Sequence, residues 1–434
     1  MKKLLVILSC ILLCGCSNQA VEKKKEATEK KVAINSDLQL EMKEWKYLFW
    51  NGDGNEDGYY RIAQREVEKG DSISNLRYFD YKTKQEVYLC DKPECLHNDE
   101  TCTSYLEDTI INSTIFVYQD HLYLTSFKGS DIAIGGNQNY GANLYQMDLD
   151  GKNRKIIWSL DEGENFDQST ILVGGNKLYI PIEKEELYET VANSSMSVVK
   201  ERKLMVLDLQ TKKAKEVMDL KDKEIIGVDN NQIVLCQSHY QDDPSKYLES
   251  GEYEKYNQAM LEHQLSYYQY DLKTNNQSEQ LSIDEQNNER GAYYRNKIYW
   301  VKKGQVSCLD LKSGKYEELV SLENKGSYSI SYIIDNHLVI DLWRDNAYFN
   351  TSIISLDNLE VKTSELYKRA PKEPVDILNV CQDYLLVRYD HEGKNETTWA
   401  GTDQFEVSKE YYGLISKDDF WNNQANYQSL KEVE

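Results

Sequence analysis

The chain has 434 residues, of which 40% are hydrophobic and 29% are charged. This apolar fraction is enough for a large core, and the charged fraction is too high for a polytopic membrane protein. A net charge of −22 disfavours binding to nucleic acid or to anionic lipid through charge. The excess of Tyr (33) over Pro (5) favours β-strands that keep one face in water.

The N-terminus has the features of a bacterial signal peptide. Met1–Lys3 is basic, and Leu4–Leu13 is an apolar run that is too short to span a bilayer as a helix. The next residues, Leu13-Cys14-Gly15-Cys16, resemble the bacterial lipobox. This resemblance implies that residues 1–15 are removed and that the Cys16 thiol carries a diacylglyceryl group. An ordinary secretory signal is the alternative.

Residues 16–37 are small, polar and charged, and they contain almost nothing to bury. Such a composition is typical of a flexible tether, so we expect the folded domain to comprise residues 38–434. Two fatty chains anchor a protein firmly where one chain would be marginal. The sequence therefore predicts an extracytoplasmic domain, lipid-anchored at the outer face of the cytoplasmic membrane.

A first repeated pattern in the body of the chain is an alternating apolar strand that ends in Asp. Polar turn residues and a second strand follow each copy, which is the pattern of a β-hairpin. The copies are Leu76–Asp80, Leu144–Asp148, Leu204–Asp208, Tyr267–Asp271, Val306–Asp310, Ile353–Asp357 and, more weakly, Leu414–Asp418.

A second repeated pattern precedes all but the first of these strands. An apolar strand runs into a turn with Asp or Asn, and apolar residues follow. Asp and Asn tolerate the positive φ of tight hairpins. The copies are Asp120–Tyr123, Asn176–Tyr179, Asn231–Val234, Asn296–Tyr299, Asn336–Val339 and Asp383–Leu386. The first unit shows only the strand Trp45–Trp50, and Ile34–Leu40 is the candidate for its missing inner strand.

Together the two patterns give units of four antiparallel strands, repeated along the chain. Four-stranded sheets at this spacing are typical of the blades of a β-propeller. We therefore predict an all-β fold with seven blades, while the irregular spacing leaves six or eight open. One helical insertion is expected over Pro244–Leu265, between the second and third strands of the fourth unit, because Asp242-Asp243 makes a good helix start.

The hairpin Asn143–Asn153 resembles the strand–turn signature of TolB-like propellers. It is also similar to propeller lipoproteins of Gram-positive bacteria, a resemblance that is diffuse over Trp45–Glu434. The resemblance implies a propeller fold and a surface location. It does not imply a particular activity.

One segment combines three thiols and an imidazole within thirteen residues, namely Cys90, Cys95, His97 and Cys102. Three thiolates and one imidazole suit a four-coordinate metal such as zinc. In an exported protein, a disulfide from Cys90 or Cys95 to Cys102 is the main alternative, and unlinked thiols are a third. The remaining cysteines of the domain occupy strand positions that we expect to be buried: Cys236, Cys308 and Cys381.

A weaker metal candidate precedes this cluster. Asp53, Asn55 and Asp57 follow the first half of a calcium-binding loop, with oxygen ligands at alternate positions. The second half departs from the pattern, since Arg61 and Gln64 occupy the ninth and twelfth positions. A plain hairpin turn explains the same Asp, Asn and Gly residues.

Signatures of the common enzyme classes, such as G-x-S-x-G, G-x-G-x-x-G and H-E-x-x-H, are missing from the sequence. The favoured function is therefore a membrane-tethered propeller that binds a peptide, a glycan or an envelope partner. Two alternatives remain. One is a propeller hydrolase or lyase that acts on extracellular polymer, and the other is an assembly or sensing subunit of a membrane complex.

Overall fold

Strands make up most of the described chain, which confirms the predicted all-β class. The computed structural model describes residues 39–44, 52–68, 71–106, 113–126, 142–167, 170–191, 194–282, 290–323, 326–345, 347–397 and 403–433. All of them belong to the compact unit Asp37–Glu434. The predicted signal peptide, Cys16 and tether lie outside the described residues and stay predictions. Within the described ranges, no helix is both long and apolar enough to cross a membrane.

Among the described residues, seven antiparallel sheets have four or more strands and are here called blades, and four consecutive strands of the chain make up the body of each. Blade 1 holds β2 (Gly52–Gly54), β3 (Gly58–Glu68), β4 (Asp71–Asp80) and β5 (Gln85–Tyr88), with β6 (Tyr105–Leu106) also paired to β4. Blade 2 holds β7 (Thr114–Tyr118), β8 (His121–Thr125), β9 (Asn143–Asp148) and β10 (Lys155–Ser159). Blade 3 holds β12 (Thr170–Gly174), β13 (Lys177–Val191), β14 (Ser194–Asp208) and β15 (Lys213–Asp219), with β1 (Glu41–Glu44) and β11 (Glu164–Phe166) added.

The second half of the chain continues the same arrangement. Blade 4 holds β16 (Lys223–Asp229), β17 (Gln232–Tyr240), β18 (His263–Asp271) and β19 (Asn276–Gln277). Blade 5 holds β20 (Ala292–Tyr294), β21 (Lys297–Lys302), β22 (Gln305–Asp310) and β23 (Tyr316–Ser321). Blade 6 holds β24 (Ser327–Ile334), β25 (His337–Arg344), β26 (Ala347–Ser355) and β27 (Val361–Thr363). Blade 7 holds β30 (Asp376–Val380), β31 (Tyr384–Thr397), β32 (Asp403–Ser416) and β33 (Gln428–Leu430), after the small hairpin β28 (Tyr367–Lys368) and β29 (Glu373–Pro374).

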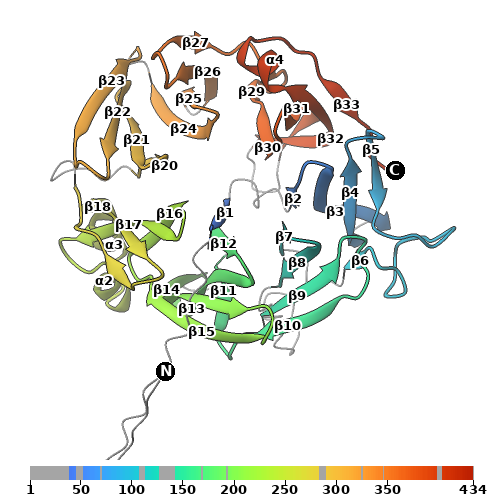
Figure 1. Ribbon diagram of the computed structural model, residues 1–434, viewed down its shortest axis with the longest axis horizontal. Coiled ribbons are helices and arrows are strands. Elements are labelled where there is room, and N and C mark those ends of the chain that lie inside the picture. Colours follow the sequence, from blue (N-terminus) through green and yellow to red (C-terminus); the bar gives the residue numbers. More distant parts are fainter. Residues whose placement is uncertain are drawn as a thin grey trace, which may run out of the picture. The chain divides into compact units, whose positions relative to one another are not determined.

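The seven blades are arranged in a ring around a central axis, which is the arrangement of a seven-bladed β-propeller (Figure 1). The core consists of seven apolar clusters, and each cluster joins two neighbouring blades. The cluster that closes the ring packs Tyr59 and Phe79 of blade 1 against Leu386 and Tyr412 of blade 7. Among the described strands, blade 7 takes none from the N-terminal end of the chain. The ring closes through these side chains and through a backbone bridge between Gln85 of β5 and Lys431, beside which the Glu86 N–H donates to the Lys431 carbonyl.

The repeated Asp residues explain why the third and fourth strands of a blade form hairpins. The Asp80 carboxylate accepts hydrogen bonds from the backbone N–H groups of Lys82 and Thr83. The Lys84 N–H then bonds to the Asp80 carbonyl, and Lys84 has a positive φ of 58°. Asp208, Asp271 and Asp310 make equivalent turns. The seventh copy differs, because β32 ends at Ser416 and a helix follows it.

The prediction for the inner strand of blade 1 is wrong. Its inner strand is β2, whose three residues pair with Tyr59–Arg61 of β3. Leu40 belongs instead to the cluster between blades 3 and 4, and β1 directly after it pairs with β12 of blade 3. Figure 1 shows β1 inside the ring, beside β12. The predicted strand Trp45–Trp50 lies outside the described residues.

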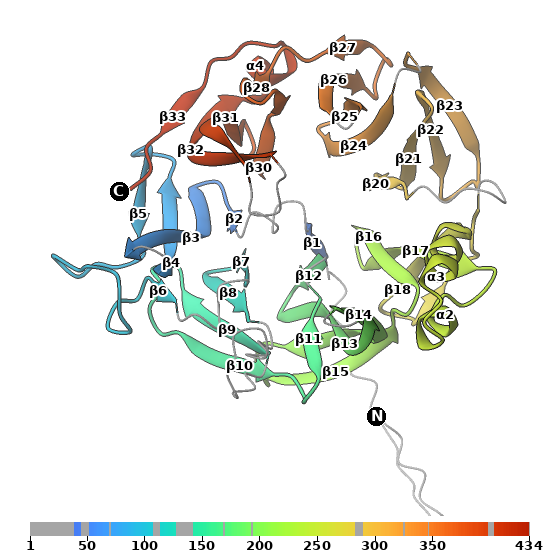
Figure 2. The same ribbon diagram turned by 180° about the vertical axis from the view of Figure 1, so that it is seen from behind.

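The helical insertion is confirmed in position but not as one helix. Two short helices, α2 (Ser245–Glu249) and α3 (Tyr253–Leu261), lie between β17 and β18 of blade 4 (Figure 2). Gly251 between them has a φ of +74°, which ends the first helix. The chain is already back in a strand at His263. A further helix that the sequence analysis did not predict, α4 (Lys417–Trp421), joins β32 to β33.

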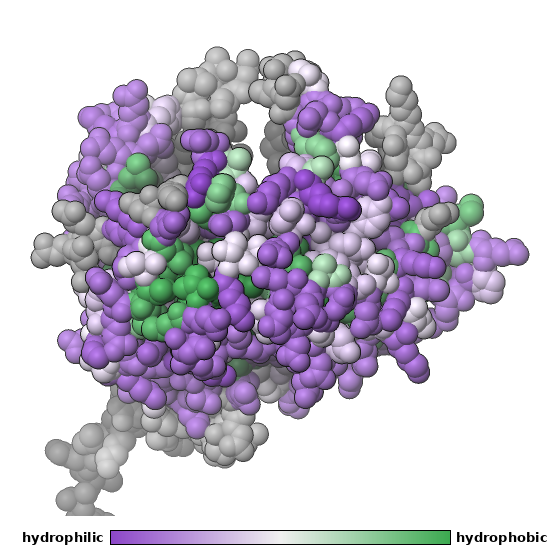
Figure 3. All heavy atoms as spheres, turned by 90° about the horizontal axis from the view of Figure 1, so that it is seen from above, coloured by the Kyte–Doolittle hydropathy of each residue, from purple (hydrophilic) through white to green (hydrophobic). Residues whose placement is uncertain are grey.

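The outermost strands form the wall of the ring. Seen from the side, this wall is mostly hydrophilic, with a hydrophobic patch at the left of the view and smaller hydrophobic areas elsewhere (Figure 3). Several exposed apolar side chains belong to outermost strands: Val87, Ile156, Tyr316 and Val361. Single exposed apolar residues of this kind are normal on a protein surface.

Candidate metal centre and central pocket

The cysteine-rich segment is an insertion in the outermost strand of blade 1. β5 pairs with Arg77–Asp80 of β4, and β6 continues the same line by pairing with Ser74 and Asn75. Leu76, between these two pairings, bonds to both ends of the insertion, because its carbonyl accepts from the Leu89 N–H and its N–H donates to the Ser104 carbonyl. Residues 89–104, here called the metal loop, therefore leave the sheet and return to the same point. In Figure 1 the metal loop projects outward beside β5 and β6.

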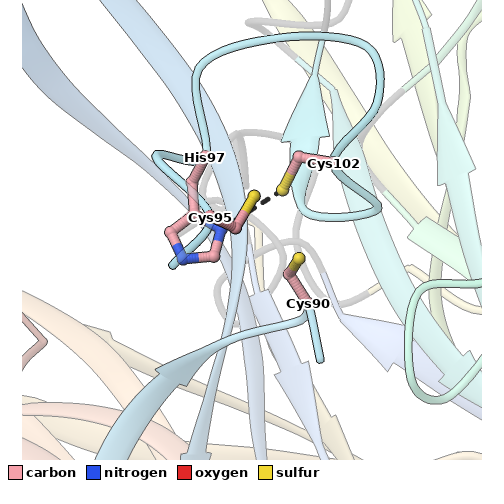
Figure 4. Close-up of side chains that lie close together, drawn as sticks. All are labelled: Cys90, Cys95, His97 and Cys102. Carbon is pink, nitrogen blue, oxygen red and sulfur yellow. Dashed lines mark hydrogen bonds between the residues drawn. The ribbon is translucent and has the colours of Figure 1, made fainter. Parts of the chain in front are cut away.

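The metal loop brings four predicted ligands together. The Sγ atoms of Cys90, Cys95 and Cys102 and a ring nitrogen of His97 all lie within 4.8 Å of one another (Figure 4). His97 Nδ1 is 3.2 Å from Cys102 Sγ. Donor atoms around a tetrahedral zinc are about 3.5–3.8 Å apart, given the usual Zn–S and Zn–N distances. The cluster can therefore hold a metal ion after small movements of the side chains.

Contacts with blade 1 hold the tip of the metal loop in place. Asn75 Nδ2 donates to the His97 carbonyl at 2.9 Å, and an Arg65 guanidinium N–H donates to the Leu96 carbonyl at 2.5 Å. The His97 ring is stacked on Tyr88 of β5, with ring centroids 4.0 Å apart. His97 itself has a positive φ of 55°. The imidazole is therefore oriented by a neighbouring ring and by backbone anchors.

The electrostatic environment suits a neutral imidazole. Burial lowers the pKa of His97, and the positive charges of Arg65 and Arg77 lower it further. Burial raises the pKa of Cys102 to about 11. The pKa of Cys90 is lowered, because hydrogen bonds from the Lys92 N–H and the neighbouring thiols outweigh its partial burial. A cation bound between these thiols would favour the thiolate form of all three.

The positions of the other cysteines agree with the prediction. Cys236, Cys308 and Cys381 are buried, and burial raises their thiol pKa values. The thiols of the metal loop and these three are all free, and no disulfide joins cysteines in the described part of the chain.

The weak calcium candidates take part in other contacts. Asp53 is buried, and its carboxylate accepts from Lys43 Nζ at 3.0 Å and from the Val117 N–H at 2.8 Å. The Asn55 side-chain oxygen accepts from the N–H groups of Asp57 and Gly58. These contacts are those of a hairpin turn and of a link between blades. The calcium site stays a prediction, and nothing in the described contacts adds to it.

A second candidate site, which the sequence analysis missed, is a pocket between the innermost strands of the ring, and the space that these strands enclose is here called the central channel. The pocket has a volume of about 770 Å³ and is lined by the inner strands β1, β12, β16, β20 and β24, together with part of β21. Six consecutive residues of β24, Tyr328–Ile333, line it. Its charged lining residues are Glu44 and Arg290, and Arg290 is paired with Glu224. No sequence motif could reveal this pocket, since five separate stretches of chain form it.

The two faces of the ring differ in their connections. On one face, the second and third strands of each blade are joined, and these strands reach fifteen residues each in β13 and β14 and fourteen each in β31 and β32. Helices α2 and α3 occupy the corresponding connection of blade 4. On the other face, described turns of a few residues join the first strand to the second, as at Arg295-Asn296 and Asp335-Asn336. We call the first of these the hairpin face.

Comparisons with known proteins found distant structural neighbours. No family model matches the chain, and no curated protein matches it. Among solved structures, TolB from Acinetobacter baumannii is 15% identical with a TM-score of 0.31, over 67% of this chain and 60% of that TolB. The β-propeller domain of the Trilobed protease from Pyrococcus furiosus is 9% identical with a TM-score of 0.43, over 91% of this chain and 99% of that domain.

Oligogalacturonate lyase from Vibrio parahaemolyticus is 9% identical with a TM-score of 0.38, over 87% of this chain and 92% of the lyase. TolB and other propellers are thus structural neighbours of this chain, as the sequence resemblance implied at the level of the fold. At these identities and TM-scores the neighbours carry no argument about the activity of this chain. The strand pairings of the chain itself make it a seven-bladed β-propeller protein.

Proposed function

We propose that the protein is a lipid-anchored, extracytoplasmic propeller that binds a partner through its hairpin face. The observation that carries this proposal is the asymmetry of the two faces. Long hairpins in blades 3 and 7 and the helix pair of blade 4 all extend the same kind of connection. Extended loops on a rigid scaffold are where proteins commonly place binding residues.

The described site is less suited to catalysis than to binding. Among the residues that line the central pocket, Glu44 is the single carboxylate. Two buried carboxylates outside the pocket have partners of their own. Asp341 accepts from Ser331 and Thr351, and Asp390 is paired with Arg369. A glycoside hydrolase would instead typically need two acidic side chains that converge on one pocket.

The anchor is the second part of the proposal and rests on the lipobox-like sequence that ends at Cys16. Its test is metabolic labelling with a fatty-acid analogue. Cys16→Ser should abolish labelling and release the protein from the membrane fraction, whereas Cys14→Ser should leave both unchanged. Full labelling of Cys16→Ser would contradict the anchor.

Zinc in the metal loop is the third part. The donor set supports zinc, because four soft or borderline ligands converge on one point. A single disulfide would use only two of the thiols, so the third thiol and His97 would have no role in it. The metal would join the base of the loop, where Cys90 and Cys102 lie, to its tip at Cys95 and His97. Such a link would give order to sixteen residues that have few core contacts.

Cobalt substitution tests the metal site directly. Apo protein, prepared with chelator and reductant, is titrated with Co²⁺, and the visible thiolate–cobalt absorption is recorded. One equivalent should give a tetrahedral thiolate spectrum, which zinc then displaces. Cys95→Ser should weaken the spectrum, while Cys236→Ser should retain it, because Cys236 lies between blades 4 and 5. An absence of thiolate absorption would contradict the site.

The binding role is tested by changing the two faces separately in the full-length protein. In one variant, residues 185–200 of the β13–β14 hairpin are replaced by Asn-Gly, a favoured two-residue turn. In the control, Asn275→Gly alters a turn on the opposite face at a position with a φ of 57° that glycine tolerates. Membrane partners captured after cross-linking should be lost from the hairpin variant and retained by the control. Equal capture by both variants would contradict a role for the hairpin face.

A further inference from the structure

The central pocket differs from a typical small-molecule cleft in the nature of its walls. Its lining consists largely of the innermost strands of four blades, and each of these strands stands at the end of its sheet or next to that end. The innermost strand of a sheet turns one edge, with alternate N–H and C=O groups, toward the channel. Such edges can pair with a ligand that itself presents backbone donors and acceptors.

The chain itself shows that the channel admits an added strand. β1 is not part of the four-strand body of any blade, yet it lies in the channel and pairs antiparallel with β12. The register runs from Glu41 opposite Val173 to Glu44 opposite Thr170 without a shift. Met42 and Glu44 of β1 also line the pocket. One wall of the pocket is therefore already built by strand addition.

The opposite wall offers a similar site. β24 pairs with β25 and, among the described strands, with no other. The pairing is regular from Ser327 to Ile330 and is then interrupted by a bulge at Ser331. A bulge blunts a sheet edge, so regular pairing with a further strand is restricted to the segment before it. This segment has four residues, the same length as β1.

The side chains of the wall argue against a ligand recognised through Tyr hydroxyls, as a sugar would be. The hydroxyl of Tyr293 accepts from the Asn296 N–H, and that of Tyr332 accepts from the Ile377 N–H. The Tyr294 hydroxyl bonds to both the side chain and the N–H of Asn336. These hydroxyls therefore already make hydrogen bonds within the protein. Ser329, in contrast, is exposed on the regular part of β24.

We infer that the central pocket binds an extended peptide segment, which pairs as a strand with Ser327–Ile330 of β24. The inference rests on the proposed binding function and names the class of partner that the channel takes. A segment of four residues spans about 13 Å, which matches the four-residue regular edge of β24, and a hexapeptide extends past that edge by two residues. Arg290 is already paired with Glu224 and Glu44 is the single carboxylate among the lining residues, so the walls favour a segment without strong negative charge.

The test uses the full-length protein and two probes. One is a pool of hexapeptides with blocked termini, and the other is a panel of chito-, xylo- and galacturono-oligosaccharides. Ser329→Trp fills the edge of β24, and Ser321→Trp makes the same change on the exposed outermost strand of blade 5. Wild type and Ser321→Trp should retain the same subset of peptides, and Ser329→Trp should not.

The mode of binding is then tested on the wild-type protein, so the result does not depend on the folding of a variant. Methylating alternate backbone nitrogens of a selected peptide should lower its affinity about tenfold or more, because backbone hydrogen bonds are lost. Retention of oligosaccharides instead of peptides would overturn the inference, as would an affinity that is insensitive to methylation. Partner capture that depends on the hairpin face would survive either failure, so the two proposals can fail separately.

Discussion

The imidazole of His97 is stacked on the ring of Tyr88 with an angle of 14° between their planes. The Tyr88 hydroxyl accepts a hydrogen bond from Arg77 at 3.3 Å, and Arg77 also bonds to Glu86 at 3.2 Å. Glu86 lies where blade 1 meets the C-terminal residues that follow blade 7. A continuous set of contacts thus runs from the proposed metal ligand to the point at which the ring closes.

The stacked pair predicts that Tyr88→Ala weakens zinc binding without removing a ligand. Groups that orient a metal ligand typically contribute 10-fold to 100-fold to affinity, so the variant should lose about that much. Competition with a chromophoric chelator measures the change. Tyr88→Phe is the matched control, since it keeps the ring and loses only the hydroxyl. A loss of affinity in Tyr88→Phe as large as that in Tyr88→Ala would assign the effect to the hydroxyl and not to the stack.

Glu86 predicts a large effect on stability. Its fully buried carboxylate is 2.6 Å from Arg61 Nε and 3.2 Å from Arg77, and it also accepts from the Val433 N–H. Glu86→Gln would leave two buried guanidinium groups without their shared anion. We expect the free energy of unfolding to fall by about 3–5 kcal/mol in urea titrations.

The control for this variant is Glu318→Gln, on the exposed face of β23. It should change the stability by less than about 0.5 kcal/mol, as is usual for surface substitutions. A Glu86→Gln protein as stable as this control would show that the ring closes without the ion pairs of blade 1.

Glu183 predicts a pH dependence of stability. Burial raises its pKa to about 7, and Asp167 and Glu185 add to the shift while Arg202 opposes it. A carboxyl with a raised folded-state pKa contributes stability that is present below its ordinary pKa of 4.5 and is lost as the pH rises through 7. Glu183→Gln removes this loss. After allowance for solvent screening, the variant should gain about 1–2 kcal/mol over wild type between pH 4.5 and pH 8.

Unfolding curves at the two pH values test this prediction. The comparison variant is Asp222→Asn, in the connection between blades 3 and 4. Burial also raises the pKa of the Asp222 carboxyl, but the neighbouring positive charges of Lys221 and Lys223 oppose the shift. This variant should show a smaller gain in the same direction. A stability difference between Glu183→Gln and wild type that does not change with pH would contradict the raised pKa.

The seven interblade clusters predict that no blade can be removed alone. Deleting residues 376–430 would take blade 7 out of two clusters, one with blade 6 and one with blade 1. Circular dichroism and thermal unfolding should then show loss of cooperative folding in the remainder. A truncated protein that retained a sharp transition at the wild-type temperature would mean that the blades fold independently.

Sequence patterns predicted the blades because each hairpin has a local cause. The carboxylates of Asp80, Asp208, Asp271 and Asp310 bind backbone N–H groups within three residues of themselves. The candidate ligands of the metal loop could also be predicted from the sequence, since all four fall within thirteen residues. The position of the metal loop within the fourth strand of blade 1 could not be predicted, because β6 is only two residues long and shows no alternating pattern.

Other features depend on contacts between distant residues and leave no local pattern. The inner strand of blade 1 is Gly52-Asp53-Gly54, without an apolar side chain. A Cβ at Gly52 would lie 2.4 Å from atoms of the Tyr59 ring, so close packing requires glycine there. Similarly, the break between α2 and α3 depends on one residue, Gly251, within a segment whose pattern otherwise favours a single helix.

The most direct test of the account is the zinc content and free-thiol count of full-length protein purified without chelator. We predict one zinc per chain, lost in Cys95→Ser and in His97→Ala, with Cys90, Cys95 and Cys102 all recovered as thiols after the metal is removed under denaturing conditions. Protein without metal, in which two of these three thiols are missing, would show a disulfide in place of the metal centre and would contradict the account.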